Sequence, residues 1–172
     1  QRSTIISFHI FYMNISDMFT LFVDGASKKN PGQAGIGFVL YHNKKMVKAG
    51  YFYIGIATNN NAEYCALLIG IIESYKLYKM TELTIYTDSK LMAEQINLRF
   101  AIKNQVLKNC FLYFNEISCY IRIKVHHILR HKNKDADYYA NLAVSTKNPL
   151  PDYLREKLVK HGCLDSIAVD AA

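Results

Sequence analysis

The spacing of apolar and polar positions changes once along this chain, near residue 58. Before that point, three runs rich in β-branched and aromatic residues are separated by short turns, at 19–23, 35–41 and 45–53. Such runs are typical of three consecutive antiparallel strands. After it, apolar residues between 62 and 78 recur at helical spacing, and the preceding "TNNN" supplies residues that favour a helix start.

The rest of the domain alternates between strand-like and helix-like spacing of apolar residues. "ELTIYTDS" predicts a fourth strand, and "YIRIKVHHI" predicts a fifth with alternating apolar residues. Helices are expected over 89–96, 105–120 and 135–146. The order β-β-β-α-β-α-α-β-α predicts an α/β fold built on a mixed sheet, with three antiparallel strands followed by strand–helix units and helices on the faces of the sheet.

The two ends of the chain fall outside this pattern. Residues 1–17 are predicted to be an extension, because their apolar stretch is short for a membrane span and is broken by His9 and Asn14. The domain proper is predicted to cover 18–147. A tail over 148–172 carries one short helix, which Asp152 is expected to cap and on which Leu154 and Leu158 share a face.

Composition narrows the class of partner. The 172 residues carry a net charge of +7, which favours an anionic partner, although an acidic membrane surface and mere solubility fit the same charge. The four cysteines contain no C-x-x-C pair, which argues against a zinc ribbon or a redox motif. We expect a reduced, cytoplasmic setting and no membrane association.

Four carboxylates stand at the ends of the predicted elements. Asp24 is expected to end the first strand and Asp88 the fourth, while Glu63 and Asp137 are expected in the first turns of helices. If the first and fourth strands are neighbours, all four acids converge. Clustered like charges are costly unless a cation neutralises them, and an all-oxygen ligand set selects Mg²⁺ or Mn²⁺.

Taken singly, each acid also has a purely structural explanation. Glu63 is able to form a capping box with Asn60, and Asp88 is able to cap the helix that follows it. Asp137 is able to pair with Lys134 or with a lysine of a neighbouring helix. These explanations do not account for the joint placement of the four residues.

Four segments, in order, carry a family resemblance: "DGASKKNPGQAGIG", "TNNNAEYCAL", "TDSKL" and "HILRHKNKDADYYANLA". They resemble the signature segments of the type 1 ribonuclease H family, over about residues 18–147. The resemblance implies the ribonuclease H-like fold, with a five-stranded mixed sheet. It also implies an endonuclease that hydrolyses the RNA strand of RNA–DNA hybrids without base specificity and leaves 5′-phosphate ends.

The family pattern assigns a role to each matching acid. Asp24 would be shared by two Mg²⁺ ions, Glu63 and Asp88 would complete the ion at the leaving group, and Asp137 would hold the ion that activates water. His127 matches a histidine that assists proton transfer or product release in many members. A solvent-facing histidine at a strand end is an equally good explanation for it.

Substrate contacts follow from the same resemblance. Asn30, Asn59 and Asn60 match positions that contact the 2′-hydroxyl, the group that distinguishes RNA from DNA. Thr58 and Asn104 match positions of a phosphate pocket for the DNA strand. A turn at Asn30 and a helix cap at Asn59 and Asn60 are compatible with these roles.

Two departures from the family pattern keep other functions open. The connection over 98–107 is too short for the basic handle that some bacterial members insert, and the acid that often precedes the last carboxylate is missing. A catalytically weak or inactive nucleic-acid-binding module, and a nuclease of other specificity on the same fold, are therefore alternatives. The leading expectation is a monomeric, active enzyme.

Overall fold

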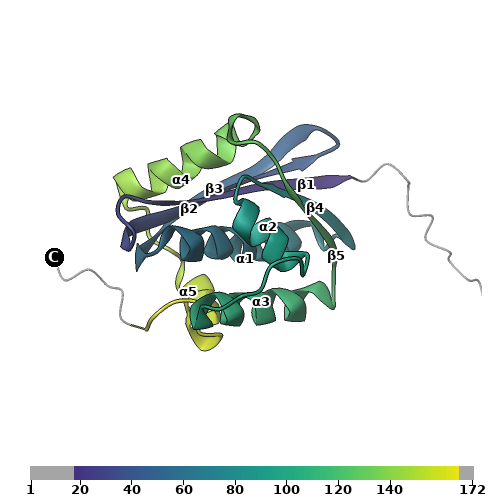
Figure 1. Cartoon of the computed structure of the whole chain (residues 1–172). Coiled ribbons are helices and arrows are strands. Elements are labelled where there is room, and N and C mark those ends of the chain that lie inside the picture. Colours follow the sequence, from purple (N-terminus) through teal and green to yellow (C-terminus); the bar gives the residue numbers. More distant parts are fainter. Residues whose placement is uncertain (1–17, 167–172) are drawn as a thin grey trace, which may run out of the picture.

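The computed structural model describes residues 18–166, and it confirms the predicted order of strands and helices (Figure 1). The strands are β1 (Phe19–Ser27), β2 (Gly32–His42), β3 (Lys45–Ala57), β4 (Glu82–Thr87) and β5 (Arg122–His127). The helices are α1 (Asn59–Tyr78), α2 (Lys90–Ile96), α3 (Gln105–Ser118), α4 (Lys134–Thr146) and α5 (Asp152–Lys160), with a short 3₁₀ turn at Arg130–Lys132.

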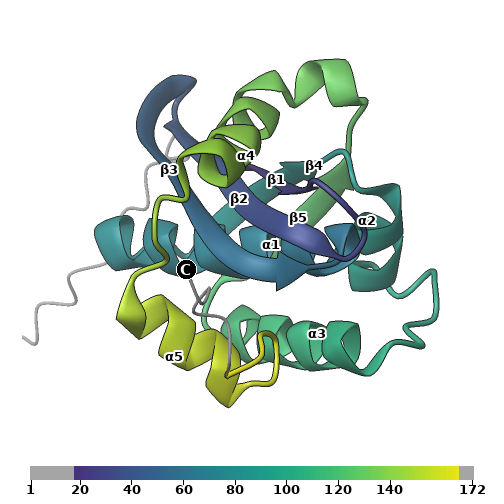
Figure 2. The ribbon, with the colours of Figure 1, turned by 90° about the vertical axis from the view of Figure 1, so that its left-hand side faces the viewer.

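The strands form one mixed sheet in the order β3-β2-β1-β4-β5. β1, β2 and β3 are antiparallel, whereas β4 runs parallel to both β1 and β5. The fold class is therefore confirmed, and the first and fourth strands are neighbours. Helix α4 lies on one side of the sheet, and α1, α3 and α5 lie on the other (Figures 1 and 2).

The core fills the space between the sheet and α1. Leu21, Val23 and Ile85 point into it from β1 and β4 and are fully buried. Every residue of α1 from Ala62 to Ile71 is buried, so this helix is enclosed on nearly all sides. Three of the four cysteines are buried and none is in a disulfide. No helix in the described range is long and apolar enough to cross a membrane.

The segment after α4 joins the same core. Leu154 and Leu158 on α5 are fully buried within it, as their shared face predicts. The expected cap is wrong in detail, because Pro151 occupies the N-cap position and Asp152 is the first helical residue.

The expected end of the first strand is also wrong. β1 continues past Asp24 to Ser27, and Asp24 lies opposite Gly37 of β2 in the interior of the ladder. Asp24 and Gly25 therefore make no turn, because pairing with β2 continues for three residues beyond Asp24. The chain reverses instead within residues 28–31.

Candidate active site

Three carboxylates meet where β1, β4 and α1 come together. Oxygen atoms of Asp24, Glu63 and Asp88 all lie within 4.8 Å of one another. Asp24 is only 4% exposed and Glu63 only 5%, while Asp88 is partly exposed just after β4. Three of the four carboxylates that were expected to converge therefore lie close together in the structure.

The start of α1 places Glu63 differently from the expectation. Thr58 is the N-cap, and its Oγ1 accepts a 3.2 Å hydrogen bond from the backbone N–H of Asn61. The capping box between Asn60 and Glu63 is therefore wrong, and Glu63 lies beyond the first turn. Its carboxylate accepts a 3.2 Å hydrogen bond from the backbone N–H of Gly25 on β1.

Gly25 allows α1 to approach β1 this closely. A Cβ atom at this position would lie 2.3 Å from the backbone carbon of Ala62 and 2.3 Å from the backbone nitrogen of Glu63. Atoms cannot approach so closely without displacing the backbone. The glycine after Asp24 thus serves helix packing, which brings the carboxylates of β1 and α1 together.

The sequence analysis missed Asn133, a fully enclosed residue next to the carboxylates. Its amide nitrogen donates to Oδ1 of Asp88 at 2.8 Å and to the carbonyl of Val23 at 3.0 Å, and the residue is 1% exposed. It occupies the N-cap position of α4 without making a side-chain cap bond. The sequence does show a polar residue before a predicted helix, but such a residue indicates a helix cap and not a contact with a carboxylate.

Asp137 lies in the first turn of α4, as predicted. Its ion pair is formed with Arg130, whose Nη2 lies 2.6 Å from Oδ1 of Asp137. Arg130 comes from the 3₁₀ turn that precedes the helix. Asp137 and Arg130 both line the same cavity of about 370 Å³ as Asp24, Glu63 and Asp88.

Burial and mutual repulsion dominate the electrostatics of the cluster, and Arg130 offsets them only in part. Burial, together with the charges of Asp88 and Asp137, raises the pKa of Asp24 to about 8, and Arg130 opposes this increase. Burial and the nearby charge of Asp24 likewise raise the pKa of Glu63 well above its usual range. The neighbouring carboxylates raise the pKa of Arg130.

This arrangement fits a hard divalent cation. The converging donors are all carboxylate oxygens, which suit Mg²⁺ or Mn²⁺ rather than a soft metal. A bound cation would also favour the ionised forms that burial and mutual repulsion now disfavour. Asp24, Glu63 and Asp88 are the residues placed to hold it, with Asp137 beside them.

The other predicted residues surround this centre. The side-chain oxygen of Asn30 accepts a 3.0 Å hydrogen bond from the backbone N–H of Asn59, which joins the loop after β1 to the start of α1. Asn59 lines the acidic cavity, and Asn60 is exposed beside it. Asn104 caps α3 through a 3.1 Å bond from the N–H of Leu107. His127 is exposed at the end of β5.

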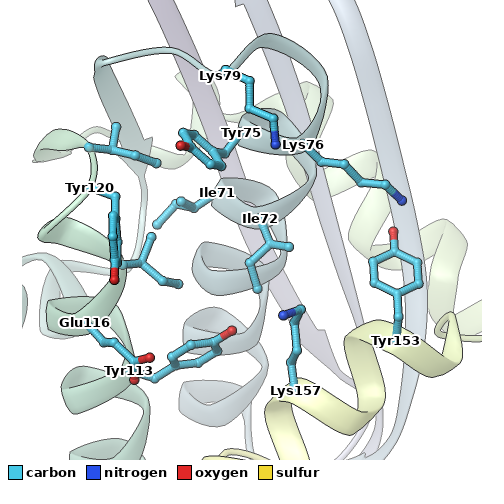
Figure 3. Close-up of a pocket in the computed structure, with 12 residues that line it drawn as sticks. Ile71, Ile72, Tyr75, Lys76, Lys79, Tyr113, Glu116, Tyr120, Tyr153 and Lys157 are labelled. Carbon is cyan, nitrogen blue, oxygen red and sulfur yellow. The ribbon is translucent and has the colours of Figure 1, made fainter.

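A larger cavity, of about 620 Å³, lies between α1, α3 and α5 (Figure 3). It is lined mainly by tyrosines, isoleucines and lysines, and Glu116 is its single acidic lining residue. It opens near the C-terminal half of α1, whereas Glu63 lies near the N-terminus of that helix. The carboxylate chemistry is therefore confined to the smaller cavity.

The chain is similar to several known proteins. A family model for RNase H matches residues 16–145. A bifunctional protein of Mycobacterium tuberculosis is 36% identical over 125 residues, which are 70% of this chain and 34% of that protein. Ribonuclease HI of Halobacterium salinarum is 32% identical over 125 residues, covering 72% of this chain and 62% of that protein. The chain thus spans from one third to somewhat under two thirds of the length of these relatives.

Two solved structures are also similar to this chain. The N-terminal RNase H domain of the M. tuberculosis protein, solved as a fusion with maltose binding protein, has a TM-score of 0.72 at 32% identity, covering 77% of this chain and 96% of that one. LC11-RNase H1, isolated from compost and solved in complex with an RNA/DNA hybrid, has a TM-score of 0.72 at 30% identity, covering 74% and 97%.

The five-stranded mixed sheet and its acidic centre define the class of α/β proteins that carry a carboxylate cluster suited to a divalent cation. Within that class, this chain belongs to the RNase H family. The resemblance given by the four sequence segments is confirmed.

Proposed function

We propose that this protein is an endoribonuclease that hydrolyses the RNA strand of RNA–DNA hybrids with Mg²⁺ and leaves 5′-phosphate ends. The observation that carries the proposal is the meeting of Asp24, Glu63 and Asp88 within 4.8 Å, with Asp137 on the same cavity. Membership of the RNase H family and the likeness to a structure solved with an RNA/DNA hybrid support the choice of substrate.

The four acids are proposed to have different roles according to their positions. Two Mg²⁺ ions, when bound, supply an activated water and stabilise the leaving oxygen. Asp24, at the centre of the cluster, is proposed to be shared between them, with Glu63 and Asp88 on one side and Asp137 on the other. His127, at the exposed end of β5, is proposed to assist proton transfer or product release.

The polar residues around the cavity are proposed to recognise the hybrid. Asn30, Asn59 and Asn60 present amides at one rim, where contacts to 2′-hydroxyls would distinguish RNA from DNA. Thr58 and Asn104 are proposed to contact phosphates of the DNA strand. None of these contacts reads a base, so cleavage is expected to be independent of sequence.

The test is a cleavage assay on labelled RNA–DNA hybrid, duplex RNA and duplex DNA, with Mg²⁺, Mn²⁺ or EDTA. Metal-dependent cutting of only the RNA strand of the hybrid, abolished by Asp24→Asn, supports the proposal. Asp152→Asn, on the first residue of α5, is the matched control and is expected to cut normally. A folded wild-type protein that leaves the hybrid uncut with either metal would refute the proposal.

One observation favours the alternative of a weakly catalytic or inactive binding module. Arg130 already neutralises Asp137 at 2.6 Å, so a cation must compete with a guanidinium for this carboxylate. In that case the hybrid binds to the wild type in Mg²⁺ without being cut. Binding measured by gel shift beside the cleavage assay distinguishes the two functions.

A further inference from the structure

The sheet carries a row of aromatic side chains on the side away from α1. Phe22 on β1 pairs in register with Tyr86 on β4, and Tyr86 pairs with His126 on β5. Ring centroids of Phe22 and Tyr86 are 5.2 Å apart, and those of Tyr86 and His126 are 5.6 Å apart. Tyr41 on β2 extends the row, with its ring 5.6 Å from that of Phe22. We refer to Tyr41, Phe22, Tyr86 and His126 as the aromatic row.

This row is partly accessible and is most open at its β5 end. Because side chains alternate along a strand, Leu21 and Ile85 face the buried core, whereas Phe22 and Tyr86 face the opposite side. Helix α4 lies on that opposite side and packs on β1, β2 and β3, which include the strands of Phe22 and Tyr41, whereas Tyr86 and His126 lie on β4 and β5. His126 is exposed, and the other three members of the row are partly exposed.

A cavity of about 510 Å³ opens at one end of the row. Phe22 and Tyr41 form its aromatic wall, and residues just before and within the start of α4 form the facing wall. Asn133 belongs to this facing wall, and the same side chain donates to Asp88 in the acidic site. The cavity and the acidic site are therefore direct neighbours, separated by one residue.

The rim of the cavity is basic. Lys44, Lys132 and Lys134 line it, against the single carboxylate of Asp135. That carboxylate accepts a 2.8 Å hydrogen bond from the hydroxyl of Tyr41. Further along the row, Lys124 stands two residues before His126 and therefore on the same face of β5.

Aromatic faces inside a basic rim suit one class of ligand. Single-stranded nucleic acid stacks its bases on aromatic side chains while its phosphates follow positive charge. Sheets that bind single strands do this with aromatic residues on neighbouring strands, which stack two or three bases. A duplex offers no exposed base faces, and an acidic peptide offers few flat rings to match such a row.

We propose that the aromatic row and its lysine rim bind an unpaired, single-stranded stretch of nucleic acid that adjoins the hybrid held at the acidic site. This rests on the proposed function for the position of the hybrid. The partner would be single-stranded DNA or RNA, bound without reading its sequence. Its duplex part would enter the acidic cavity on the other side of Asn133.

The test is the affinity of the full chain for labelled oligothymidylate and oligouridylate of about 12 nucleotides, measured by fluorescence anisotropy in EDTA. We expect the double variant Tyr86→Thr/His126→Thr to bind both at least about 25-fold more weakly, since each of the two lost stacking contacts costs about fivefold or more. Threonine favours strands, which protects β4 and β5. Tyr120→Thr, which removes an exposed tyrosine beyond α3, is the matched control and is expected to bind as the wild type does.

Two single variants keep the test independent of folding. His126→Thr changes an exposed side chain and is expected to weaken binding at least about fivefold. Lys132→Ala is expected to lower the slope of log affinity against log salt by about one, as the loss of one phosphate contact does.

The outcomes separate this inference from the proposed function. Unchanged binding by folded Tyr86→Thr/His126→Thr and His126→Thr variants overturns the inference, and so does a wild type that cuts hybrid but binds neither oligonucleotide. Binding that depends on the row in a wild type that does not cut hybrid supports the single-strand site and overturns the proposed function.

Discussion

The amide nitrogen of Asn133 lies 2.8 Å from Oδ1 of Asp88 and 3.0 Å from the carbonyl oxygen of Val23. One buried side chain thus joins the start of α4 to β1 and to the end of β4. Its amide nitrogen serves both acceptors, so a residue without such a donor would leave both of them without this hydrogen bond. Its position fixes a carboxylate of the acidic site against the loop that precedes Asp137.

Asn133→Ala is therefore expected to reduce hybrid cleavage by about 10- to 100-fold, as the loss of a residue that orients a metal ligand does. The free energy of unfolding is expected to fall by about 1–3 kcal/mol, because a buried carbonyl and a carboxylate lose their donor. Cleavage rates and urea denaturation measure the two effects. Asn115→Ala, on an exposed residue of α3, is the control. Wild-type activity in the Asn133 variant would contradict the assigned role.

Asp24→Asn is expected to stabilise the protein in EDTA at pH 8. The pKa of Asp24 is about 8 in the folded protein against 3.8 ordinarily, so the folded state retains a proton that the unfolded chain releases between those pH values. The free energy of unfolding contributed by this group therefore falls as the pH rises from about 4 to about 8. Asparagine removes this loss, which amounts to at most about 6 kcal/mol at about 1.4 kcal/mol per pKa unit. Urea denaturation at pH 5 and pH 8 measures it, and an equal pH dependence in both proteins would refute the explanation.

Arg130→Gln is expected to lower the Mg²⁺ concentration needed for half-maximal activity. The guanidinium competes with any cation for Asp137, and the side chain of Arg130 is 76% exposed, so the ion pair is worth at most about 1 kcal/mol. The expected change is thus up to about fivefold, read from a metal titration of cleavage. Arg155→Gln on α5 is the control. An unchanged or increased metal requirement would show that Arg130 does not compete at this site.

Gly25→Ala is expected to separate α1 from β1. The added Cβ would lie 2.3 Å from backbone atoms of Ala62 and Glu63. Backbone atoms within a helix cannot move aside as the end of a flexible side chain can. We expect a loss of about 3 kcal/mol in the free energy of unfolding, at the upper end of overpacking effects, together with loss of cleavage. At Gly70, the Cβ would meet only side-chain atoms, the nearest at 3.1 Å, so Gly70→Ala is the milder control. Equal denaturation midpoints for the two variants would contradict the close approach.

Leu154→Ala is expected to cost about 2–5 kcal/mol in the free energy of unfolding, although it lies beyond the predicted domain. Leu154 is fully buried in the common core, and the neighbouring Tyr153 donates a hydrogen bond to Glu73 of α1. Thermal or urea unfolding measures the loss. Leu77→Ala, at a leucine that is 52% exposed on α1, is expected to cost far less. A single unfolding transition that shifts as a whole would support one cooperative unit that includes α5.

The sequence predicted more of the fold than of the contacts within the site. Periodicity predicted every strand and helix in order, because apolar spacing directly reflects which faces are buried. It ended the first strand too early, at Asp24, because pairing with β2 continues to Ser27; the turn expected at Asn30 lies where the chain reverses. The helix start was likewise misplaced, because Thr58 and three asparagines compete for the same cap.

The sequence by itself determined that this chain is an α/β protein of the RNase H family and which four acids are the candidates for its acidic site. Only the tertiary structure decided that Arg130 pairs with Asp137, that Asn133 holds Asp88, and that Phe22, Tyr86 and His126 form one row. The reason is physical. Periodicity and capping are local properties of neighbouring residues. The contacts of Asn133 and of the aromatic row join segments far apart in the chain, and the Arg130–Asp137 pair depends on how the 3₁₀ turn leads into α4.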